Sequence, residues 1–148
     1  ELVLRISKLG KGIAARYAYR YYDALTVGID FTARDLQHRF SQAGHPWELS
    51  KTFDGSAPVG TFIEAERFPD HSDISFSLEI NGELRQEGNT SDLIFGFAEI
   101  IEYVSKYYTL KTGDLIFTGT PSGVGRVKKG DNLVARLAGE TVLDFFVR

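Results

Sequence analysis

The stretch DLIFTGTPSGVG, residues 114–125, places Thr120, Pro121 and Ser122 between glycines directly after an apolar run. Pro121 biases Thr120 toward extended backbone, and Pro-Ser-Gly is typical of a turn. The glycines let the main chain approach a ligand closely. The loop therefore predicts a rigid Thr120 hydroxyl and several amides facing one small anion, about the size of a carboxylate. The same residues also fit a tight connection between two strands.

Two other interpretations of this glycine-rich loop are excluded. A phosphate-binding loop or dinucleotide fingerprint needs a helix that opens where the glycines end. Residues 124–127 instead lead into the turn KKGD and then into another strand-like run. A serine nucleophile elbow needs the pattern G-x-S-x-G followed by a helix, and the sequence around Ser122 has neither. The loop is expected to serve a different ligand.

Carboxylates supply a second kind of chemistry. Asp30 ends an apolar strand-like run, and Glu1 begins another. Both are oxygen ligands suited to Mg²⁺, Mn²⁺ or Ca²⁺ rather than to zinc. Taken alone, each also fits an exposed cap or turn former, because isolated acids are mostly solvated. The three histidines, His38, His45 and His71, have no spacing that indicates a zinc site.

Basic and amide side chains follow Asp30 along the chain. Arg34 and Gln37 lie three residues apart in a predicted helix and therefore share a face. They are either a solvated pair or a carboxylate-binding pair, in which arginine supplies bidentate recognition. Lys51 follows the tryptophan-centred stretch HPWELSK. Most lysines are exposed and have no further role, so its position alone does not distinguish the two cases.

The composition is typical of a globular protein that binds neither nucleic acid nor membrane. The 148 residues are 43% hydrophobic and 25% charged, the net charge is −3, and no basic stripe is present. No apolar stretch approaches the length of a membrane span or signal sequence, and the chain has no cysteine. A cytoplasmic protein is the expectation. Because residue 1 lies inside a strand-like alternation, we also expect the natural chain to extend upstream.

Strands are expected to position most of these residues. Period-two alternation predicts a half-buried strand over residues 1–8, and short apolar strands are expected over 24–30 and 114–119. The dipeptides Asn81-Gly82 and Ala138-Gly139 each separate two strand-like runs, which predicts two hairpins. Strands outnumber helices without a strict alternation of the two, so the fold class is expected to be α+β, mainly β, in one domain.

Two helices are expected between these strands. The first covers residues 33–43, with Thr32 as its cap and Asp35 at the capping-box position. The second covers residues 91–107, where apolar residues recur at helical spacing and Asp92 suits the first turn.

Four motifs in chain order resemble those of the fumarylacetoacetate hydrolase family, most of all its short acylpyruvase-type members: GIDFTARDLQ, WELSKTFDGSAPVG, NGELRQEGNTSDLIF and GDLIFTGTPSGVG. The resemblance runs through the whole chain. It implies a catalytic domain over residues 1–148 that lacks the N-terminal part of the family domain. It also implies a mainly β fold, a mixed β-sheet roll with a few helices, and a homodimer.

The resemblance implies a divalent cation, Mg²⁺ with Mn²⁺ or Ca²⁺ as alternatives, held by an E-x-E pair and one aspartate. Asp30 matches that aspartate, and Glu1 matches the second glutamate of the pair. Two glutamates so spaced on a strand face the same side. The first glutamate is absent from this sequence, as is the upstream His/Glu lid pair that activates water. No general base is therefore assigned.

The remaining candidate residues match positions that contact substrate in the family. Arg34 and Gln37 match two contacts on a helix, and Lys51 matches the active-site lysine, which binds substrate and acts in catalysis. Thr120 matches the hydroxyl that helps to hold the pyruvyl carboxylate. On this interpretation the loop binds the carboxylate of a 2-oxo acid.

The function implied is a Mg²⁺-dependent hydrolase that cleaves the C–C bond of a short acylpyruvate, a 2,4-dioxo acid, to pyruvate and a carboxylic acid. The metal and Lys51 would stabilise the negative charge that develops on the C2 oxygen. An oxaloacetate decarboxylase or a hydroxymuconate-type isomerase using the same metal site is the alternative within enzymes. A non-catalytic relative that keeps the fold is the alternative outside them.

Overall fold

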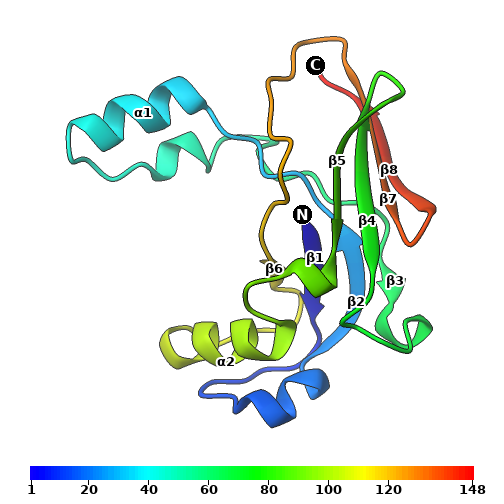
Figure 1. The fold of residues 1–148 in the computed structure, drawn as a ribbon. Helices are drawn as coiled ribbons and strands as arrows, with labels where there is room; N and C mark the ends of the chain where they lie inside the picture. Colours follow the sequence, from blue (N-terminus) through cyan, green and yellow to red (C-terminus); the bar gives the residue numbers. More distant parts are fainter.

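Two four-stranded antiparallel sheets form the body of the protein in a computed structural model, which describes residues 1–148 (Figure 1). The first sheet has the strand order β3-β2-β1-β6, with β1 (Leu2–Ile6), β2 (Tyr22–Val27), β3 (Ile63–Glu64) and β6 (Leu115–Phe117). The second has the order β5-β4-β7-β8, with β4 (Ser75–Ile80), β5 (Glu83–Asn89), β7 (Asn132–Leu137) and β8 (Glu140–Phe146). The expected α+β, mainly β class is confirmed. Every strand pair is antiparallel, whereas the resemblance implied a mixed sheet.

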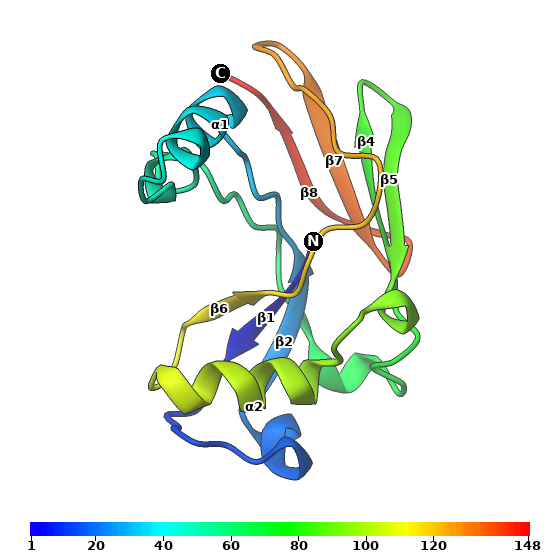
Figure 2. The same ribbon diagram turned by 60° about the vertical axis from the view of Figure 1, so that its left-hand side comes forward.

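Two α-helices and four short 3₁₀-helices complete the fold. Helix α2 (Phe97–Tyr107) packs with the 3₁₀-helix η1 (Ala15–Arg20) at one end of the first sheet (Figure 2). Helix α1 (Arg34–Gln42) has no buried residue and projects from the body (Figure 1). The other 3₁₀-helices are η2 (Glu48–Ser50), η3 (Ala65–Arg67) and η4 (Thr90–Asp92). None of the helices combines the length and the apolar character needed to cross a membrane.

Strand β1 is buried on both faces. Leu2, Val3 and Leu4 are all fully buried, although the alternation of Leu2, Leu4 and Ile6 predicts a strand with only one buried face. Leu2 and Leu4 point to one face, where they join the main core, and Val3 points to the other. On that second face Val3 and the Phe117 ring pack over Gly28, where a Cβ would lie within 3 Å of both side chains.

Both predicted hairpins are confirmed. Asn81 and Gly82 have φ of 54° and 81°, so the β4–β5 turn has positive φ at both central positions, as a mirror-image hairpin turn requires. Ala138 and Gly139 have φ of 48° and 83° and join β7 to β8 in the same way. These turns connect the β4–β5 and β7–β8 pairs of the second sheet.

Helix α2 begins at Phe97, so the predicted start at residue 91 is wrong. Asn89 accepts a hydrogen bond from the Ser91 amide and caps the short η4 helix instead. The chain then runs irregularly until the Glu99 carboxylate accepts from the Gly96 amide at 2.9 Å, which closes the N-terminal end of α2. Local capping by side chains therefore overrides the apolar spacing.

The predicted cap of α1 is also wrong. Ala33 is the N-cap residue and forms no side-chain hydrogen bond, while the Thr32 hydroxyl donates to the Asp30 carbonyl at 3.4 Å. Asp35 lies in the first turn but makes no capping hydrogen bond. Strand β2 ends at Val27 rather than at Asp30, so Asp30 lies in the segment that leads to α1.

Asp131 joins the tip of the β4–β5 hairpin to the start of β7. Its side chain is 6% exposed. One carboxylate oxygen accepts from the Asn81 side-chain amide at 3.0 Å, and the other accepts from the Lys128 backbone amide at 2.9 Å. These hydrogen bonds hold the pKa of Asp131 below its ordinary value near 3.8. As the pH falls, the Asp131 carboxylate is therefore protonated at a higher pH in the unfolded chain than in the folded protein.

We expect Asp131→Asn to lower the urea midpoint at neutral pH and to reduce the loss of stability below about pH 4. A lowered pKa contributes stability that is present above the ordinary value and lost as pH falls through the folded-state pKa. Urea unfolding at pH 7 and at pH 3 measures both effects. If the variant loses as much stability as the wild type between the two pH values, the carboxylate does not make this contribution.

Candidate active site

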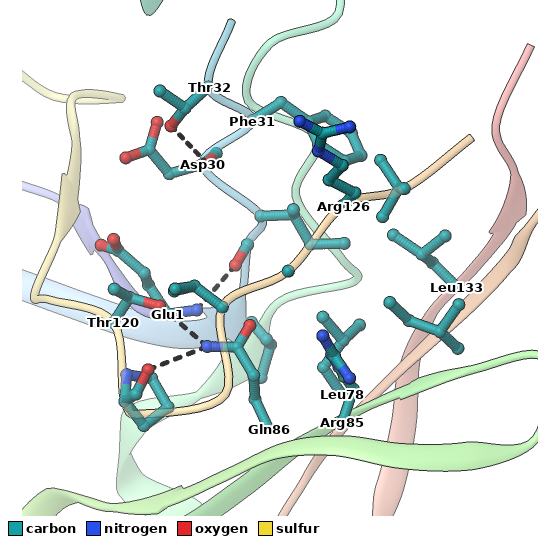
Figure 3. Close-up of a pocket in the computed structure, with 18 of the residues that line it drawn as sticks. Glu1, Asp30, Phe31, Thr32, Leu78, Arg85, Gln86, Thr120, Arg126 and Leu133 are labelled. Carbon is teal, nitrogen blue, oxygen red and sulfur yellow. Dashed lines mark hydrogen bonds between the residues drawn. The ribbon is translucent and has the colours of Figure 1, made fainter. Parts of the chain in front are cut away.

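A cavity of about 780 Å³ opens between the two sheets. Its walls come from the start of β1, residues 27–35, strands β4 and β5, and the loop after β6 (Figure 3). Most of the site residues predicted from the sequence line it, namely Glu1, Asp30, Arg34, Lys51 and Thr120. Gln37 does not. The fold thus gathers residues that are up to 119 positions apart (120 − 1) in the sequence.

Antiparallel pairing of β1 with β2 brings Glu1 close to Asp30. The Gly28 amide donates to the Glu1 carbonyl at 2.9 Å, which places Asp30 two residues beyond that contact. Figure 3 shows the two carboxylates on the same side of the cavity. Glu1 Oε2 also accepts from the Gly119 amide at 3.1 Å, so β1 and the loop after β6 meet at this carboxylate.

Lys51 forms an ion pair with Asp30 through Nζ and Oδ2. The Ala33 amide donates to the Ser50 carbonyl at 2.9 Å, which holds the segment before α1 against the segment that carries Lys51. The Lys51 and Asp30 side chains are 29% and 36% exposed, so the pair contributes little to stability. Its consequence is chemical, because it places an ammonium group beside a carboxylate of the kind that binds hard cations.

The loop that carries Thr120 is anchored on β5. Gln86 Nε2 donates to Thr120 Oγ1 at 3.1 Å and to the Pro121 carbonyl at 2.9 Å (Figure 3). The Thr120 hydroxyl therefore has a fixed position at the cavity wall.

The glycines of this loop allow it to pack against β5, whereas the sequence predicted that they allow close approach to a ligand. A Cβ at Gly123, whose φ is +96°, would lie 2.3 Å from the Arg85 carbonyl oxygen. A Cβ at Gly125 would lie 2.1 Å from the Arg85 guanidinium. The absence of side chains at these positions lets the loop lie directly against β5.

Arg34 and Gln37 lie on α1, and of the two only Arg34 lines the cavity. Arg34 Nη1 donates to Gln37 Oε1 at 2.7 Å, which confirms that the two share a helix face. Gln37 borders a separate shallow hollow with His38, Ser41 and Trp47. A substrate contact by Gln37 stays a prediction.

Sequence reasoning missed the amide and the two guanidinium groups of the cavity wall, which belong to Gln86, Arg85 and Arg126. Neither guanidinium forms a salt bridge. Figure 3 shows both on the side of the cavity away from Glu1 and Asp30. The stretch NGELRQEG contains the available signal, an arginine and a glutamine on the strand after the Asn81-Gly82 turn, but nothing local shows what they face.

The donor set of the cavity fits a hard divalent cation. Glu1 and Asp30 supply carboxylate oxygens, and Glu1 Oε1 and Asp30 Oδ1 accept no hydrogen bond from the protein. No group of three or more histidine, cysteine, aspartate or glutamate side chains is arranged for a metal. Magnesium sites commonly use one or two carboxylates and complete the octahedron with water and substrate oxygens.

The family model for the C-terminal domain of fumarylacetoacetate hydrolase matches residues 1–147. The chain belongs to this family. One curated relative is the mitochondrial oxaloacetate tautomerase FAHD1 of Mus musculus. It is 43% identical over 148 residues, which are 100% of this chain and 67% of that protein. The oxaloacetate tautomerase YcgM of Escherichia coli K12 is 44% identical over 117 residues, which are 78% of this chain and 53% of that protein. The chain thus spans about half to two thirds of these relatives.

Solved structures of the fumarylacetoacetate hydrolase family have the same fold. A family protein from Yersinia pestis CO92 is 41% identical with a TM-score of 0.95, over 100% of this chain and 70% of that one. The fumarylpyruvate hydrolase of Pseudomonas aeruginosa, solved with Mn²⁺ and pyruvate, is 40% identical with a TM-score of 0.88, over 94% of this chain and 60% of that one.

We expect Asp30→Asn to weaken Mn²⁺ binding by about a hundredfold, because an amide replaces a carboxylate that is open to the cavity. Isothermal titration of the protein with Mn²⁺ measures this directly. Asp35→Asn is the matched control, since Asp35 lines the same cavity from α1, while Lys51 forms its ion pair with Asp30. Equal Mn²⁺ affinity in the wild type and the Asp30 variant would remove Asp30 from the ligand set.

Proposed function

We propose that the protein is a divalent-metal-dependent enzyme that interconverts the enol and keto forms of oxaloacetate. The observation that carries the proposal is the meeting of Glu1, Asp30, Lys51 and Thr120 at one cavity. The similarity of the chain to two oxaloacetate tautomerases, at 43% and 44% identity, supports the choice of reaction. We propose Mg²⁺ as the native metal, while the expected homodimer and cytoplasmic location stay predictions.

Glu1 and Asp30 would hold the cation, which, when bound, would polarise the oxygens of a 2-oxo acid. We assign the C2 oxygen to Lys51, and the ion pair of its ammonium with Asp30 supports this assignment. In tautomerisation the C2 enol hydroxyl loses a proton and C3 gains one. Between these two events the C2 oxygen carries negative charge, and a hydrogen bond from Lys51 would stabilise it.

The other polar groups of the wall would bind the two carboxylates of the substrate. Thr120 lies beside Glu1, at the end of the cavity that holds the carboxylates (Figure 3). Arg85 and Arg126 lie on the opposite side and have no salt-bridge partner. A four-carbon dicarboxylate would be recognised by cationic groups at its far end, since guanidinium groups bind carboxylates in a bidentate manner.

Hydrolysis of an acylpyruvate to pyruvate and a carboxylic acid is the second candidate. It is supported by the similarity to the fumarylpyruvate hydrolase solved with Mn²⁺ and pyruvate. Both reactions bind a pyruvyl group and place negative charge on the C2 oxygen. The two differ at C4, which is a carboxylate carbon in oxaloacetate and a ketone in an acylpyruvate.

The deciding experiment compares both reactions in one protein preparation. Ketonisation of freshly dissolved enol-oxaloacetate is followed by ultraviolet absorbance, and loss of acetylpyruvate is followed with pyruvate release, each with Mg²⁺ or with a chelator. We expect ketonisation to be accelerated and the chelator to abolish the effect. Faster cleavage of acetylpyruvate would favour the hydrolase instead, and activity unchanged by the chelator would contradict both.

We expect Lys51→Met to lower kcat and kcat/KM together by about a hundredfold, as for loss of one donor to a developing oxyanion. Steady-state kinetics on enol-oxaloacetate tests this. Lys106→Met on α2 is the control, because Lys106 pairs with Glu102 on the same helix and does not line the cavity. A Lys51 variant with raised KM and intact kcat would show that Lys51 only binds substrate.

A further inference from the structure

Gln86 is a polar residue of the cavity wall whose side-chain amide is hydrogen bonded to the loop after β6. It lies on β5, and the two protons of its Nε2 are shared among Thr120 Oγ1 at 3.1 Å, the Pro121 carbonyl at 2.9 Å and the Ser122 carbonyl at 3.5 Å. Two of these acceptors are carbonyl oxygens, which cannot donate. The amide must therefore present its nitrogen to the loop, because the reversed orientation would place oxygen against oxygen.

This contact determines what the Thr120 hydroxyl can do. A hydroxyl has one proton to donate and two lone pairs that accept. Since Thr120 Oγ1 already accepts from Gln86, its own proton has to point away from the amide. The hydrogen bond from Gln86 is the one that the Thr120 side chain makes within the protein. The proton is thus available to an acceptor inside the cavity that Thr120 lines.

The loop is held on its other side as well. The Gly119 amide donates to Glu1 Oε2 at 3.1 Å, and the Thr118 hydroxyl donates to the Leu2 carbonyl at 2.9 Å. Between β1 on one side and Gln86 on the other, Thr120 has little freedom to turn. Its hydroxyl is oriented before any ligand arrives, which lowers the entropy lost on binding.

We propose that Gln86 is a positioning residue that makes the Thr120 hydroxyl a hydrogen-bond donor to the carboxylate of the bound acid, an inference that rests on the proposed 2-oxo acid function. Gln86 acts through Thr120 and needs no contact with the substrate. A residue without an N–H at this position would leave the hydroxyl free to donate to the Pro121 or Ser122 carbonyl. The hydroxyl would then offer lone pairs, rather than a proton, to the carboxylate.

A double-mutant cycle on pyruvate binding tests the inference. Pyruvate is titrated calorimetrically into the protein saturated with Mn²⁺, for the wild type, Gln86→Met, Thr120→Val and the double variant. We expect about fivefold weaker binding for Gln86→Met and about tenfold for Thr120→Val. The double variant should bind as weakly as Thr120→Val alone, because Gln86 has nothing to orient once the hydroxyl is gone. In kinetics, Gln86→Met should raise KM and leave kcat within about twofold.

Two further variants separate positioning from a general loss of stability. Thr112→Val removes a hydrogen bond from the turn before β6 to the Ser7 carbonyl, and Thr112 does not line the cavity. It should lower the thermal midpoint and leave pyruvate affinity unchanged. Thr120→Ser keeps the hydroxyl, so it should bind pyruvate nearly as well as the wild type and should still lose about fivefold when combined with Gln86→Met.

The outcomes distinguish the two levels of the proposal. A wild type that binds no pyruvate and turns over no 2-oxo acid overturns the proposed function and the inference with it. A wild type that binds pyruvate, together with unchanged affinity in Gln86→Met, overturns only the role of Gln86. Equal losses from Gln86→Met in the wild-type and Thr120→Val backgrounds also overturn that role, because they show that Gln86 acts independently of the hydroxyl.

Discussion

The central position of β1 is the constraint on which the candidate site depends. β1 pairs with β2 along one edge and with β6 along the other, so Glu1, which directly precedes β1, lies between the segments that leave those two strands. The Glu1 carbonyl accepts from Gly28, and the Glu1 carboxylate accepts from Gly119. Asp30 and Thr120 follow these contacts within two residues. Pairing of β1 with its two neighbours thus brings Glu1, Asp30 and Thr120 together. Full burial of Leu2, Val3 and Leu4 stabilises this pairing.

The charged side chains around the cavity form two groups, one beside β1 and one on the second sheet. The carboxylates of Glu1 and Asp30 would repel each other across a shared cavity, and the Lys51 ammonium offsets part of that repulsion at Asp30. A divalent cation would offset the rest. The unpaired guanidinium groups lie on the second sheet and its adjoining loop, on the opposite side from the carboxylates (Figure 3). The cavity is therefore polarised between its two sheets, which suits an elongated ligand with distinct ends.

Much of the fold follows from local sequence, because the signals involved are local. The Asn81-Gly82 and Ala138-Gly139 turns need only their own backbone preferences, and both hairpins form where the sequence predicts them. The start of α2 could not be read from apolar spacing, since capping by Asn89 and Glu99 decided it. Residues placed by the family resemblance, such as Lys51 and Thr120, do reach one cavity. Gln86 was missed because its partner lies 34 residues away, across a contact between a strand and a loop.

The packing of the loop on β5 has a consequence for how these positions can vary among related sequences. At position 125 a side chain would meet the end of the Arg85 guanidinium, a group that can move or be replaced by a shorter one. At position 123 it would meet a main-chain carbonyl from a backbone with φ of +96°, which no change at position 85 relieves. Substitutions at 125 should therefore be accompanied by smaller residues at 85, as a covarying pair, whereas glycine at 123 should be retained whatever residue stands opposite.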